Sequence, residues 1–418
     1  MGSLFDELTW RGLVHQHTDP SVPELLDKGG LTVYIGFDPT APSLHIGHLL
    51  QLCNLRRLHD GGHRPIPVVG GATGMIGDPG GRSDERNLLD SDELAENVAG
   101  IRRQVEELVP GVLVEDNGSW LKHLSAIDFL RDVGKHFTVN HMVAKESVKA
   151  RFEGRDEGIS YTEFSYMLLQ AYDYLHLFDT HGCTLQMGAS DQWGNITAGI
   201  DLIRKVRGAS VYGLTTPLVL KADGTKFGKS ASGTVWLDAA RTSPYELFQF
   251  LVRSEDTVVG QYLRYFTWLP QEEIAELERV TVEHPERREA QRALAVEVTT
   301  LVHGKAEAER ALLASQALFS EDIAMLDERT LLGVFADAPS TDRSRGELDG
   351  EGLGLVEVLV GSGLASSNGD ARRAFPGVYV NNVKVADPER RLTSADLLHG
   401  AYIVVRKGKR SFHLLRFG

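Results

Sequence analysis

The stretch YIGFDPTAPSLHIGHLL, residues 34–50, decides the fold, because an apolar strand passes into a helix within it. The apolar run before Asp38 predicts a β-strand, and the sequence from His45 onward predicts a helix. His45 and His48 bracket Ile46 and Gly47 at the expected start of that helix. Two histidines at this place could hold a metal, move a proton or contact a phosphate, and the remainder of the chain has to distinguish these roles.

Strands and helices alternate on both sides of this stretch. Short β-branched runs predict strands at 31–37, 64–71 and 183–190. Longer helical periodicities predict helices at 45–62, 96–108 and 162–178. This alternation predicts an α/β domain over residues 1–243, built on a Rossmann-like doubly wound parallel sheet that binds ligands at the carboxyl ends of its strands.

The pattern changes twice after this domain. Residues 244–336 lack strand signals and predict an all-helical domain. Residues 337–352, DAPSTDRSRGELDGEG, are polar and rich in Gly, Pro and Ser, which predicts a flexible linker. Residues 353–418 predict a small α/β domain with a hairpin turn at Asn381 and Asn382.

Length and composition narrow the class of protein. With 418 residues, 42% of them hydrophobic and 24% charged, the chain has the composition of a soluble globular protein with room for two or three domains. The first 30 residues carry regular charges and no apolar run, so we expect no signal peptide, no transmembrane helix and a cytoplasmic location. Because Cys53 and Cys183 are the only cysteines, we expect neither a disulfide framework nor a cysteine-based zinc site.

The charge is distributed unevenly along the chain. The formal net charge is -14, yet the segment from Leu353 to the end carries ten basic and five acidic residues. That segment is therefore +5, and the rest of the chain is -19. A basic module attached to an acidic body predicts that this end of the chain binds a polyanion.

Two glycine-containing segments differ from the common nucleotide-binding motifs. GGATGMIGDPGG, residues 70–81, spaces its glycines in threes and lacks the GxGxxG dinucleotide fingerprint. DGTKFGKS, residues 223–230, ends in GKS but has one intervening residue too few for a Walker A loop. Lys226 and Lys229 in this segment suit a cationic clamp on phosphates, and a solvated surface turn is an equal alternative on this segment alone.

The two histidines fit the anion role better than the other two. A zinc site would need a third ligand, and neither an HExxH motif nor a nearby cysteine supplies one. An acid–base pair would need an orienting carboxylate, for which Asp38 is the only local candidate. As anion contacts, the histidines follow a strand and lie at a helix N-terminus, where backbone N–H groups already favour negative charge. Gly47 leaves room there for a flat base, although either histidine alone could simply cap a surface helix.

Polar residues also recur on a second predicted helix. Tyr166, Gln170 and Asp173 share one face of the helix at 162–178, within otherwise apolar sequence. Such a stripe either faces solvent or contacts a ligand inside a pocket, and spacing alone does not choose between them. Asp191 and Gln192 directly follow a predicted strand, at the sheet edge where ligands bind.

Together these segments resemble a known enzyme family. HIGH at 45–48 with KFGKS at 226–230 resembles the paired signature of the class I aminoacyl-tRNA synthetases, whose second motif is more often KMSKS. The segments YIGFDPTAPSLHIGH, GDPGG, TEFSYMLLQAYD and GASDQWGNITAG are similar to those of the bacterial tyrosyl-tRNA synthetases. The C-terminal domain resembles the S4 RNA-binding domain of these enzymes. The resemblance covers nearly the whole chain.

The resemblance implies a role for each matching residue. Tyrosine would be bound by Tyr34, Asp78, Tyr166, Gln170, Asp173 and Gln192, with Tyr34 and Asp173 at the phenolic hydroxyl. Residues expected to act on the ATP phosphates or the nucleoside during catalysis are Thr40, His45, His48, Arg82, Arg86, Lys226, Lys229 and Ser230. ATP and the adenylate would also contact Gly36, Asp38, Gly47 and Asp191, with His45 toward phosphate and His48 toward the nucleoside. RNA would be contacted by Arg372, Arg373, Lys384, Arg406, Lys407, Lys409 and Arg410.

The implied activity is that of a tyrosine–tRNA ligase working as a homodimer in the cytoplasm. The carboxylate of tyrosine would attack the α-phosphate of ATP in line, and the tyrosyl group would then pass to the 3′ end of tRNA(Tyr). Mg²⁺ would accompany ATP without a dedicated protein site, and no zinc is expected. Three alternatives remain at this point: a tryptophanyl-tRNA synthetase, another ligase or nucleotidyltransferase with a HIGH-type helix, and a non-catalytic RNA-binding protein.

Overall fold

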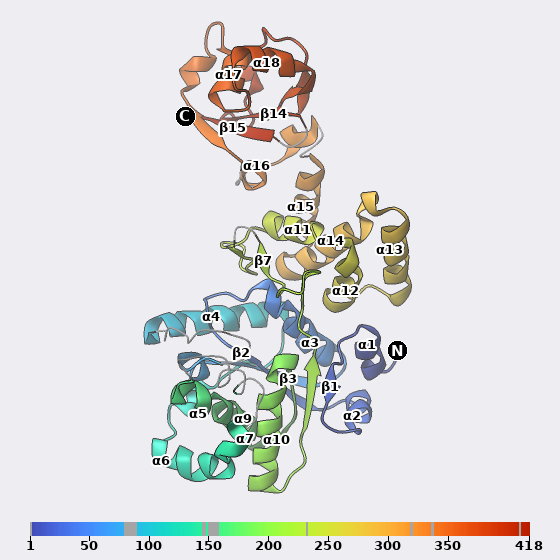
Figure 1. The fold of residues 1–418 in the computed structure, drawn as a ribbon, viewed down its shortest axis with the longest axis vertical. Coiled ribbons are helices and arrows are strands. Elements are labelled where there is room, and N and C mark those ends of the chain that lie inside the picture. The colour runs from blue at the N-terminus through green and yellow to red at the C-terminus, as the bar shows by residue number, and fades with distance from the viewer. Residues whose placement is uncertain are drawn as a thin grey trace. The chain divides into compact units, whose positions relative to one another are not determined.

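The structure is a computed structural model that describes residues 2–78, 90–143, 148, 159–230, 233–317, 321–335, 338–408 and 411–418 (Figure 1). The chain forms two compact units. The first contains residues 1–241 and 254–294, and the second contains residues 242–253 and 295–418. Within the described residues, no helix is both long and apolar enough to cross a membrane.

The first unit is built on a six-stranded sheet. Its order is β1-β6-β5-β2-β3-β4, and all neighbours are parallel except β1, which pairs with β6 in the antiparallel sense. The strands are β1 (Gln16–His17), β2 (Thr32–Phe37), β3 (Arg64–Val69), β4 (Glu115–Asp116), β5 (Cys183–Ala189) and β6 (Tyr212–Thr216). The predicted doubly wound parallel sheet is confirmed, and the three strands predicted from the sequence are β2, β3 and β5.

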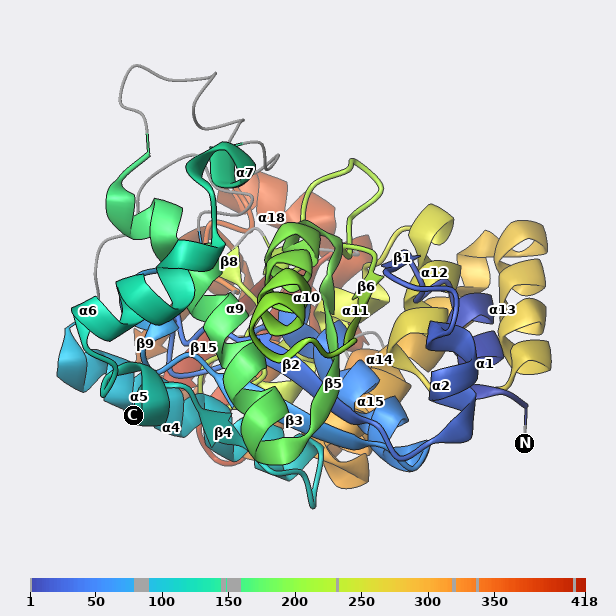
Figure 2. The ribbon, with the colours of Figure 1, turned by 90° about the horizontal axis from the view of Figure 1, so that it is seen from below.

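Helices cover both faces of this sheet. The main helices of the unit are α1 (Leu4–Trp10), α2 (Val22–Lys28), α3 (Leu49–Asp60), α4 (Ser91–Leu108), α5 (Gly118–Leu121), α6 (Ala126–Asp128), α7 (Val139–Val143), α9 (Tyr161–His181), α10 (Trp193–Arg207), α12 (Asp256–Phe266) and α13 (Gln271–Glu283). Figure 2 shows α9 and α10 side by side over the strands. On β2, Tyr34 points to this side while Val33 and Ile35 point to the opposite side, because side chains alternate along a strand.

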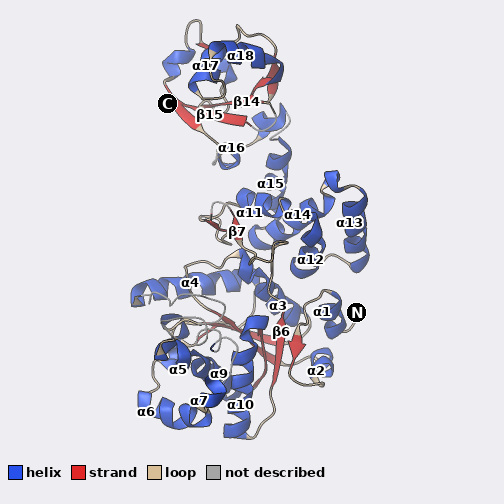
Figure 3. Ribbon diagram, in the orientation of Figure 1, coloured by secondary structure: helices blue, strands red, loops and turns tan. Residues whose placement is uncertain are grey.

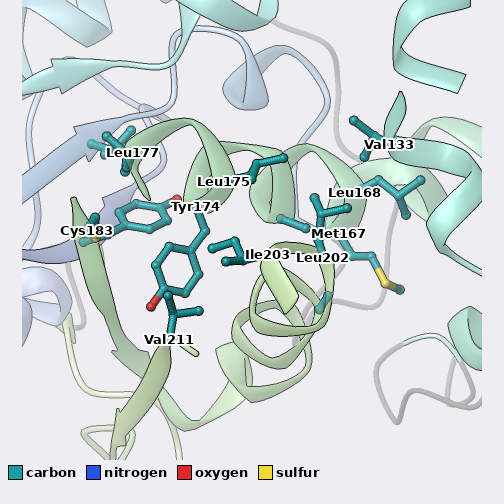
Figure 4. Packing of buried hydrophobic residues seen from close by; sticks show 14 of the residues in the cluster. Val133, Met167, Leu168, Tyr174, Leu175, Leu177, Cys183, Leu202, Ile203 and Val211 are labelled. Carbon is teal, nitrogen blue, oxygen red and sulfur yellow. The ribbon is translucent and has the colours of Figure 1, made fainter. Parts of the chain in front are cut away.

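The contact between α9 and α10 forms the core beneath the site. In Figure 4, Met167, Leu168 and Leu175 of α9 lie near Leu202 and Ile203 of α10. These side chains are nearly inaccessible to water. Because α9 is fixed along this apolar side, its polar residues have a fixed direction relative to the sheet.

The second unit combines helices with a five-stranded sheet (Figure 3). The sheet order is β12-β11-β14-β15-β9. Its strands are β9 (Ser340–Arg343), β11 (Val378–Val380), β12 (Val383–Val385), β14 (Tyr402–Lys407) and β15 (Ser411–Phe417), and two short strands, β10 (Leu353–Gly354) and β13 (Arg391–Leu392), pair separately. The helices of the unit are α11 (Pro244–Val252), part of α14 (Glu289–His303), α15 (Lys305–Ala317), α16 (Glu328–Val334), α17 (Leu355–Gly361) and α18 (Asn368–Ala374).

The hairpin predicted at Asn381 and Asn382 is confirmed. The two residues join β11 to β12 with positive φ angles of 47° and 61°, the region that a tight hairpin turn requires and that asparagine tolerates.

The prediction of a flexible linker at 337–352 is wrong for its described part. Ser340–Arg343 form β9, which pairs in parallel with β15, and Leu348 is buried in the core of the unit. The polar composition of this segment gave no sign of an edge strand. The strand is held by main-chain hydrogen bonds and by the Thr341 Oγ1–His413 Nε2 contact of 2.8 Å.

The predicted helical domain is helical in its described residues but is not a compact unit of its own. Residues 254–294 pack with the first unit, and 295–335 pack with the second. The physical reason is that α14 is one continuous helix whose two parts have different partners. The boundaries predicted at 243 and 336 therefore differ from the observed division.

Candidate active site

One cavity of about 640 Å³ opens at the carboxyl end of the first sheet, between β2 and β5. The chain leaves β2 toward β3 and leaves β5 toward β6, so this is the switch point at which doubly wound sheets bind ligands. The cavity is lined by these predicted site residues: Tyr34, Gly36, Asp38, Thr40, His45, Gly47, His48, Asp78, Tyr166, Gln170, Asp173, Asp191, Gln192 and Lys226. The fold therefore brings all of the candidate residues in this list to one place.

His45 and His48 form a compact turn in front of α3. Nδ1 of His45 accepts a hydrogen bond from the Gly47 N–H over 3.0 Å, and Nδ1 of His48 accepts one from the His45 N–H over 3.2 Å. The rings stack with centroids 3.9 Å apart. Since both Nδ1 atoms are acceptors, each neutral ring carries its proton on Nε2 and can donate it.

Desolvation sets the charge of this turn. It lowers the pKa of His48 to about 3, with a smaller contribution from His45 in the same direction. His48 is therefore neutral near pH 7 and acts as a hydrogen-bonding group rather than a cation. Coordination of a metal through Nε2 would require the ring proton to move to Nδ1, and the hydrogen bonds that the two Nδ1 atoms accept from the backbone would be lost.

Gly47 has no room for a side chain. A Cβ atom there would lie 2.7 Å from Cε1 of His45 and 3.3 Å from the carbonyl oxygen of Phe227. The sequence prediction gave Gly47 the role of leaving space for a base, and the structure adds that Gly47 lets the KFGKS segment approach the histidine turn.

The polar stripe on α9 lies inside the protein. Tyr166, Gln170 and Asp173 are 5%, 7% and 1% exposed, and all three line the cavity. Oη of Tyr166 donates to Oδ1 of Asp38 over 3.2 Å. The alternative of a solvent-facing stripe is therefore excluded.

Asp173 has two hydrogen-bond partners that the sequence interpretation missed. Nδ2 of Asn117 donates to its Oδ2 over 2.9 Å, and Nε1 of Trp120 donates to its Oδ1 over 2.7 Å. Burial raises the pKa of Asp173 to about 7, and these two donors oppose the rise. The segment NGSW, 117–120, directly follows β4 at the ligand-binding sheet edge, and this position is the signal that could have identified Asn117 and Trp120.

Tyr34 lies close to this carboxyl group. It is 3% exposed on β2, and burial raises its pKa well above the ordinary value, with Asp173 adding to the effect. Tyr34 is therefore a neutral phenol that donates or accepts hydrogen bonds next to an ionisable carboxyl group.

A second polar group occupies another wall of the cavity. Nε2 of Gln192 donates to Oδ2 of Asp78 over 2.6 Å, and Nδ2 of Asn195 donates to the same oxygen over 3.4 Å. Asn195 was not identified from the sequence, although it lies one helical turn after Gln192. These contacts hold a carboxylate where a ligand's cationic group could bind.

Asp191 and Lys226 are electrostatic neighbours in the cavity. Asp191 lies in the turn between β5 and α10 and is exposed to the cavity. Desolvation raises its pKa, and Lys226 lowers it. The structure thus places the first lysine of KFGKS near Asp191, the second residue after β5.

The remaining residues predicted from this region are described only in part. Lys229 and Ser230 form β7 (Lys229–Ser230), which pairs with β8 (Gly233–Thr234). Arg82 and Arg86 lie outside the described residues. Among the described residues, no group of three or more His, Cys, Asp and Glu side chains is arranged to hold a metal ion.

Known proteins match this arrangement over the full chain. The family described as tRNA synthetases class I (W and Y) matches residues 26–320, and the tyrosine–tRNA ligase SYY-like C-terminal domain matches 331–415. A tyrosine–tRNA ligase from Roseiflexus castenholzii is 53% identical over 424 residues, with 100% of both chains covered. One from Geobacillus stearothermophilus is 49% identical, with 99% of both chains covered. The chain belongs to the bacterial tyrosyl-tRNA synthetases.

Solved structures agree with this synthetase fold. A C-terminally truncated mitochondrial tyrosyl-tRNA synthetase of Aspergillus nidulans has a TM-score of 0.68 and 32% identity, and it covers 76% of this chain and 95% of its own. A tryptophanyl-tRNA synthetase of Encephalitozoon cuniculi, at 15% identity and a TM-score of 0.54, shares the fold alone; it covers 79% of this chain and 92% of its own. The full-length relatives favour the tyrosyl interpretation over the tryptophanyl, nucleotidyltransferase and non-catalytic alternatives.

The basic residues of the synthetase's C-terminal domain differ in how far they are exposed to solvent. Arg372, Arg373 and Lys384 are exposed, and Arg372 pairs with Glu389 over 2.6 Å. Lys407 is half-buried and lies 3.3 Å from Asp370. Lys409 and Arg410 lie outside the described residues.

Arg406 contradicts its predicted role as an RNA contact. It is 7% exposed, and its guanidinium carbon lies 3.7 Å from the ring centre of Tyr379. The sequence showed a basic run at 406–410, but alternation along β14 directs Arg406 onto a neighbouring aromatic ring.

Proposed function

We propose that this synthetase activates L-tyrosine with ATP to tyrosyl-adenylate and pyrophosphate, and then transfers the tyrosyl group to the 3′ end of tRNA(Tyr). The observation that carries the proposal is the shared cavity. The buried pair Tyr34 and Asp173 and the histidine turn at 45–48 all open on it. A phenol-recognising group and an anion-binding turn in one cavity support a reaction between tyrosine and a nucleotide.

Tyrosine would be bound through its polar ends. Tyr34 and Asp173 suit the phenolic hydroxyl, because a buried carboxylate accepts a hydrogen bond from that hydroxyl and loses this bond when the hydroxyl is absent. Asp78, Tyr166 and Gln170 would surround the ammonium group, and Gln192 would lie near the carboxylate. The same pair supports a phenol over the indole of tryptophan.

ATP would lie along the histidine turn. We assign Thr40, His45, Lys226, Lys229 and Ser230 to the phosphates, His48 to the nucleoside and Asp191 to the ribose. Gly36 and Gly47 would allow the nucleotide to approach the backbone, and Asp38 would contact it as well. Arg82 and Arg86 would close over the pyrophosphate.

The chemistry requires positioning and positive charge rather than a base. The carboxylate of tyrosine is already ionised at neutral pH and would attack the α-phosphorus in line, while the bond to the pyrophosphate oxygen breaks. Lysine ammonium groups and imidazole N–H donors would stabilise the charge on the departing pyrophosphate. Mg²⁺ would accompany ATP and be held by its phosphates.

Assembly and RNA binding complete the proposal. Exposed apolar side chains at Ile127, Leu130 and Val139, which are 70%, 51% and 63% exposed, support burial in a homodimer. The exposed cations Arg372, Arg373 and Lys384 support tRNA binding by the C-terminal domain. A cytoplasmic location is part of the same proposal, since ATP and tRNA are its substrates.

ATP–pyrophosphate exchange with each aromatic amino acid tests the proposal. We expect rapid exchange with tyrosine, exchange with phenylalanine that is slower by several orders of magnitude, and none with tryptophan. Absence of exchange with every amino acid would refute the activation step, and exchange driven by tryptophan would refute the assignment of the phenol pocket.

A further inference from the structure

Phe227, the second residue of KFGKS, is held by α12. It is 7% exposed, and its ring centre lies 4.6 Å from that of Tyr262 and 5.8 Å from that of Phe266. Both partners are 1% exposed. A phenylalanine enclosed in this way loses aromatic contacts and apolar burial if it leaves, so α12 gives the KFGKS segment a defined position.

The backbone around Phe227 is fastened to the same place. Oη of Tyr262 donates to the carbonyl oxygen of Leu220 over 2.7 Å. The Phe227 N–H donates to the carbonyl oxygen of Val219 over 3.0 Å. The carbonyl oxygen of Gly228 accepts a hydrogen bond from the Val235 N–H over 3.1 Å. Tyr262 therefore contacts both the ring of Phe227 and the strand-like segment that pairs with it.

The C-terminal end of α12, which carries these aromatic residues, is also joined to the helix that follows the histidine turn. Arg57 of α3 is 3% exposed, and its guanidinium donates to the carbonyl oxygens of Tyr265 and Thr267 over 3.0 and 2.9 Å. Arg11, the residue that follows α1, also donates to the carbonyl oxygen of Thr267 over 3.0 Å. Cationic side chains at a helix C-terminus satisfy its last carbonyls and interact favourably with its dipole, so α3 and α12 are bound firmly together.

The two signature segments therefore have a common support. α3 begins directly after His48, and α12 holds Phe227 next to Lys226. The segments also touch directly, because the carbonyl oxygen of Phe227 lies 3.3 Å from the position of a Cβ on Gly47. A shift of Phe227 would move Lys226 relative to the histidine turn.

We propose that Phe227 is a positioning residue, whose ring, seated on Tyr262 and Phe266 of α12, fixes Lys226 relative to the histidine turn for the activation step. This inference rests on the proposed function, since it concerns the transition state of adenylate formation. Phe227 lines the same cavity, but the residues proposed to bind tyrosine come from β2, α9, Asp78 and Gln192, and none of them takes part in this aromatic contact. A change at Phe227 should therefore act on turnover and leave tyrosine binding intact.

The test uses tyrosine-dependent ATP–pyrophosphate exchange by the full chain. We expect Phe227→Ala to lower kcat by about 10²-fold, the size of effect that a displacement of about 1 Å produces, with the KM for tyrosine unchanged. Phe227→Met should keep most of the wild-type kcat, because the methionine side chain can pack against Tyr262 and Phe266. Methionine is also the residue at this position in the KMSKS form of the motif. Tyr262→Phe, which removes only the bond to Leu220, should lower kcat with unchanged thermal stability.

Tyr265→Phe is the matched control on the same helix. Its hydroxyl accepts from Gln261, away from Phe227, and we expect wild-type kcat. The inference is overturned if Phe227→Ala keeps wild-type kcat, if the KM for tyrosine rises in step with the loss of kcat, or if Tyr265→Phe loses as much as Tyr262→Phe. If Phe227→Ala does not fold, Tyr262→Phe decides. Absence of exchange in the wild-type protein refutes the proposed function itself, which is a different result.

Discussion

Trp120 donates its indole N–H to Oδ1 of Asp173 over 2.7 Å, although 53 positions separate the two residues in the chain. The other oxygen, Oδ2, accepts from Asn117. Burial favours the protonated acid, and the two donors favour the carboxylate. Trp120 and Asn117 thus act against burial and help to keep Asp173 in the form that accepts a hydrogen bond from a phenolic hydroxyl.

We expect Trp120→Phe to reduce kcat/KM for tyrosine by roughly tenfold to a hundredfold, since a hydrogen bond to a charged group contributes about 1.5–3 kcal/mol. The substrate phenylalanine has no hydroxyl that could bond to Asp173, so kcat/KM for phenylalanine should stay the same. Discrimination between tyrosine and phenylalanine should therefore decline. Pyrophosphate exchange with the two amino acids measures both values. Trp268→Phe, at an exposed tryptophan, is the control and should resemble wild type. Equal losses for both amino acids would show that Trp120 only supports packing.

Asp173 also makes stability depend on pH. Its pKa rises from 3.8 to about 7 on folding, so between these values the native carboxyl binds a proton that the unfolded chain has released. The free energy of unfolding should therefore fall as pH rises through this window, by at most about 1.4 kcal/mol per unit. Asp173→Asn lacks this dependence. Urea denaturation of both proteins at several pH values between 4 and 8 should show the variant gaining relative to wild type, and parallel curves would contradict the prediction.

The pattern of apolar and polar residues in the sequence was sufficient to predict the strands and helices nearest the candidate active site. β2, β3 and β5 are apolar runs with β-branched residues, and the turn at His45 and His48 marks a strand-to-helix junction. Tyr166, Gln170 and Asp173 share a helical face because their spacing is fixed by the helix itself. Each of these signals is local, which is why a single chain reveals it.

The contacts between distant segments could not be predicted in the same way. Nothing in the spacing of Trp120 and Asp173 relates them, since they meet only when α5 and α9 are brought together in the folded domain. In the sequence Arg406 is one residue of a basic run, and only the pairing of β14 with β11 places it on Tyr379. β9 escaped detection because an edge strand is held by main-chain bonds, which composition does not reveal.

Gly47→Ala should uncouple turnover from tyrosine binding. The added Cβ would lie 2.7 Å from Cε1 of His45, so the ring has to move away from its place beside the cavity. We expect kcat for pyrophosphate exchange to fall by about 10²-fold, with tyrosine binding unchanged in equilibrium dialysis. Gly134→Ala makes the same substitution where the nearest atom is 3.7 Å away, and should behave as wild type. Wild-type turnover of Gly47→Ala would show that the position of His45 does not limit the reaction.

Lys384 and Arg406 should separate RNA binding from stability in the C-terminal domain. Lys384 is exposed on β12, whereas Arg406 is enclosed by Tyr379 and Phe412, an arrangement worth about 2 kcal/mol when desolvated. Lys384→Ala should therefore raise the KM for tRNA and reduce the slope of log affinity against log salt by about one, with pyrophosphate exchange and melting temperature unchanged. Arg406→Met should lower the melting temperature of the domain. Aminoacylation at two salt concentrations, together with thermal denaturation, distinguishes the two variants. If Arg406→Met is as stable as wild type but loses salt-dependent affinity for tRNA, Arg406 contacts RNA after all.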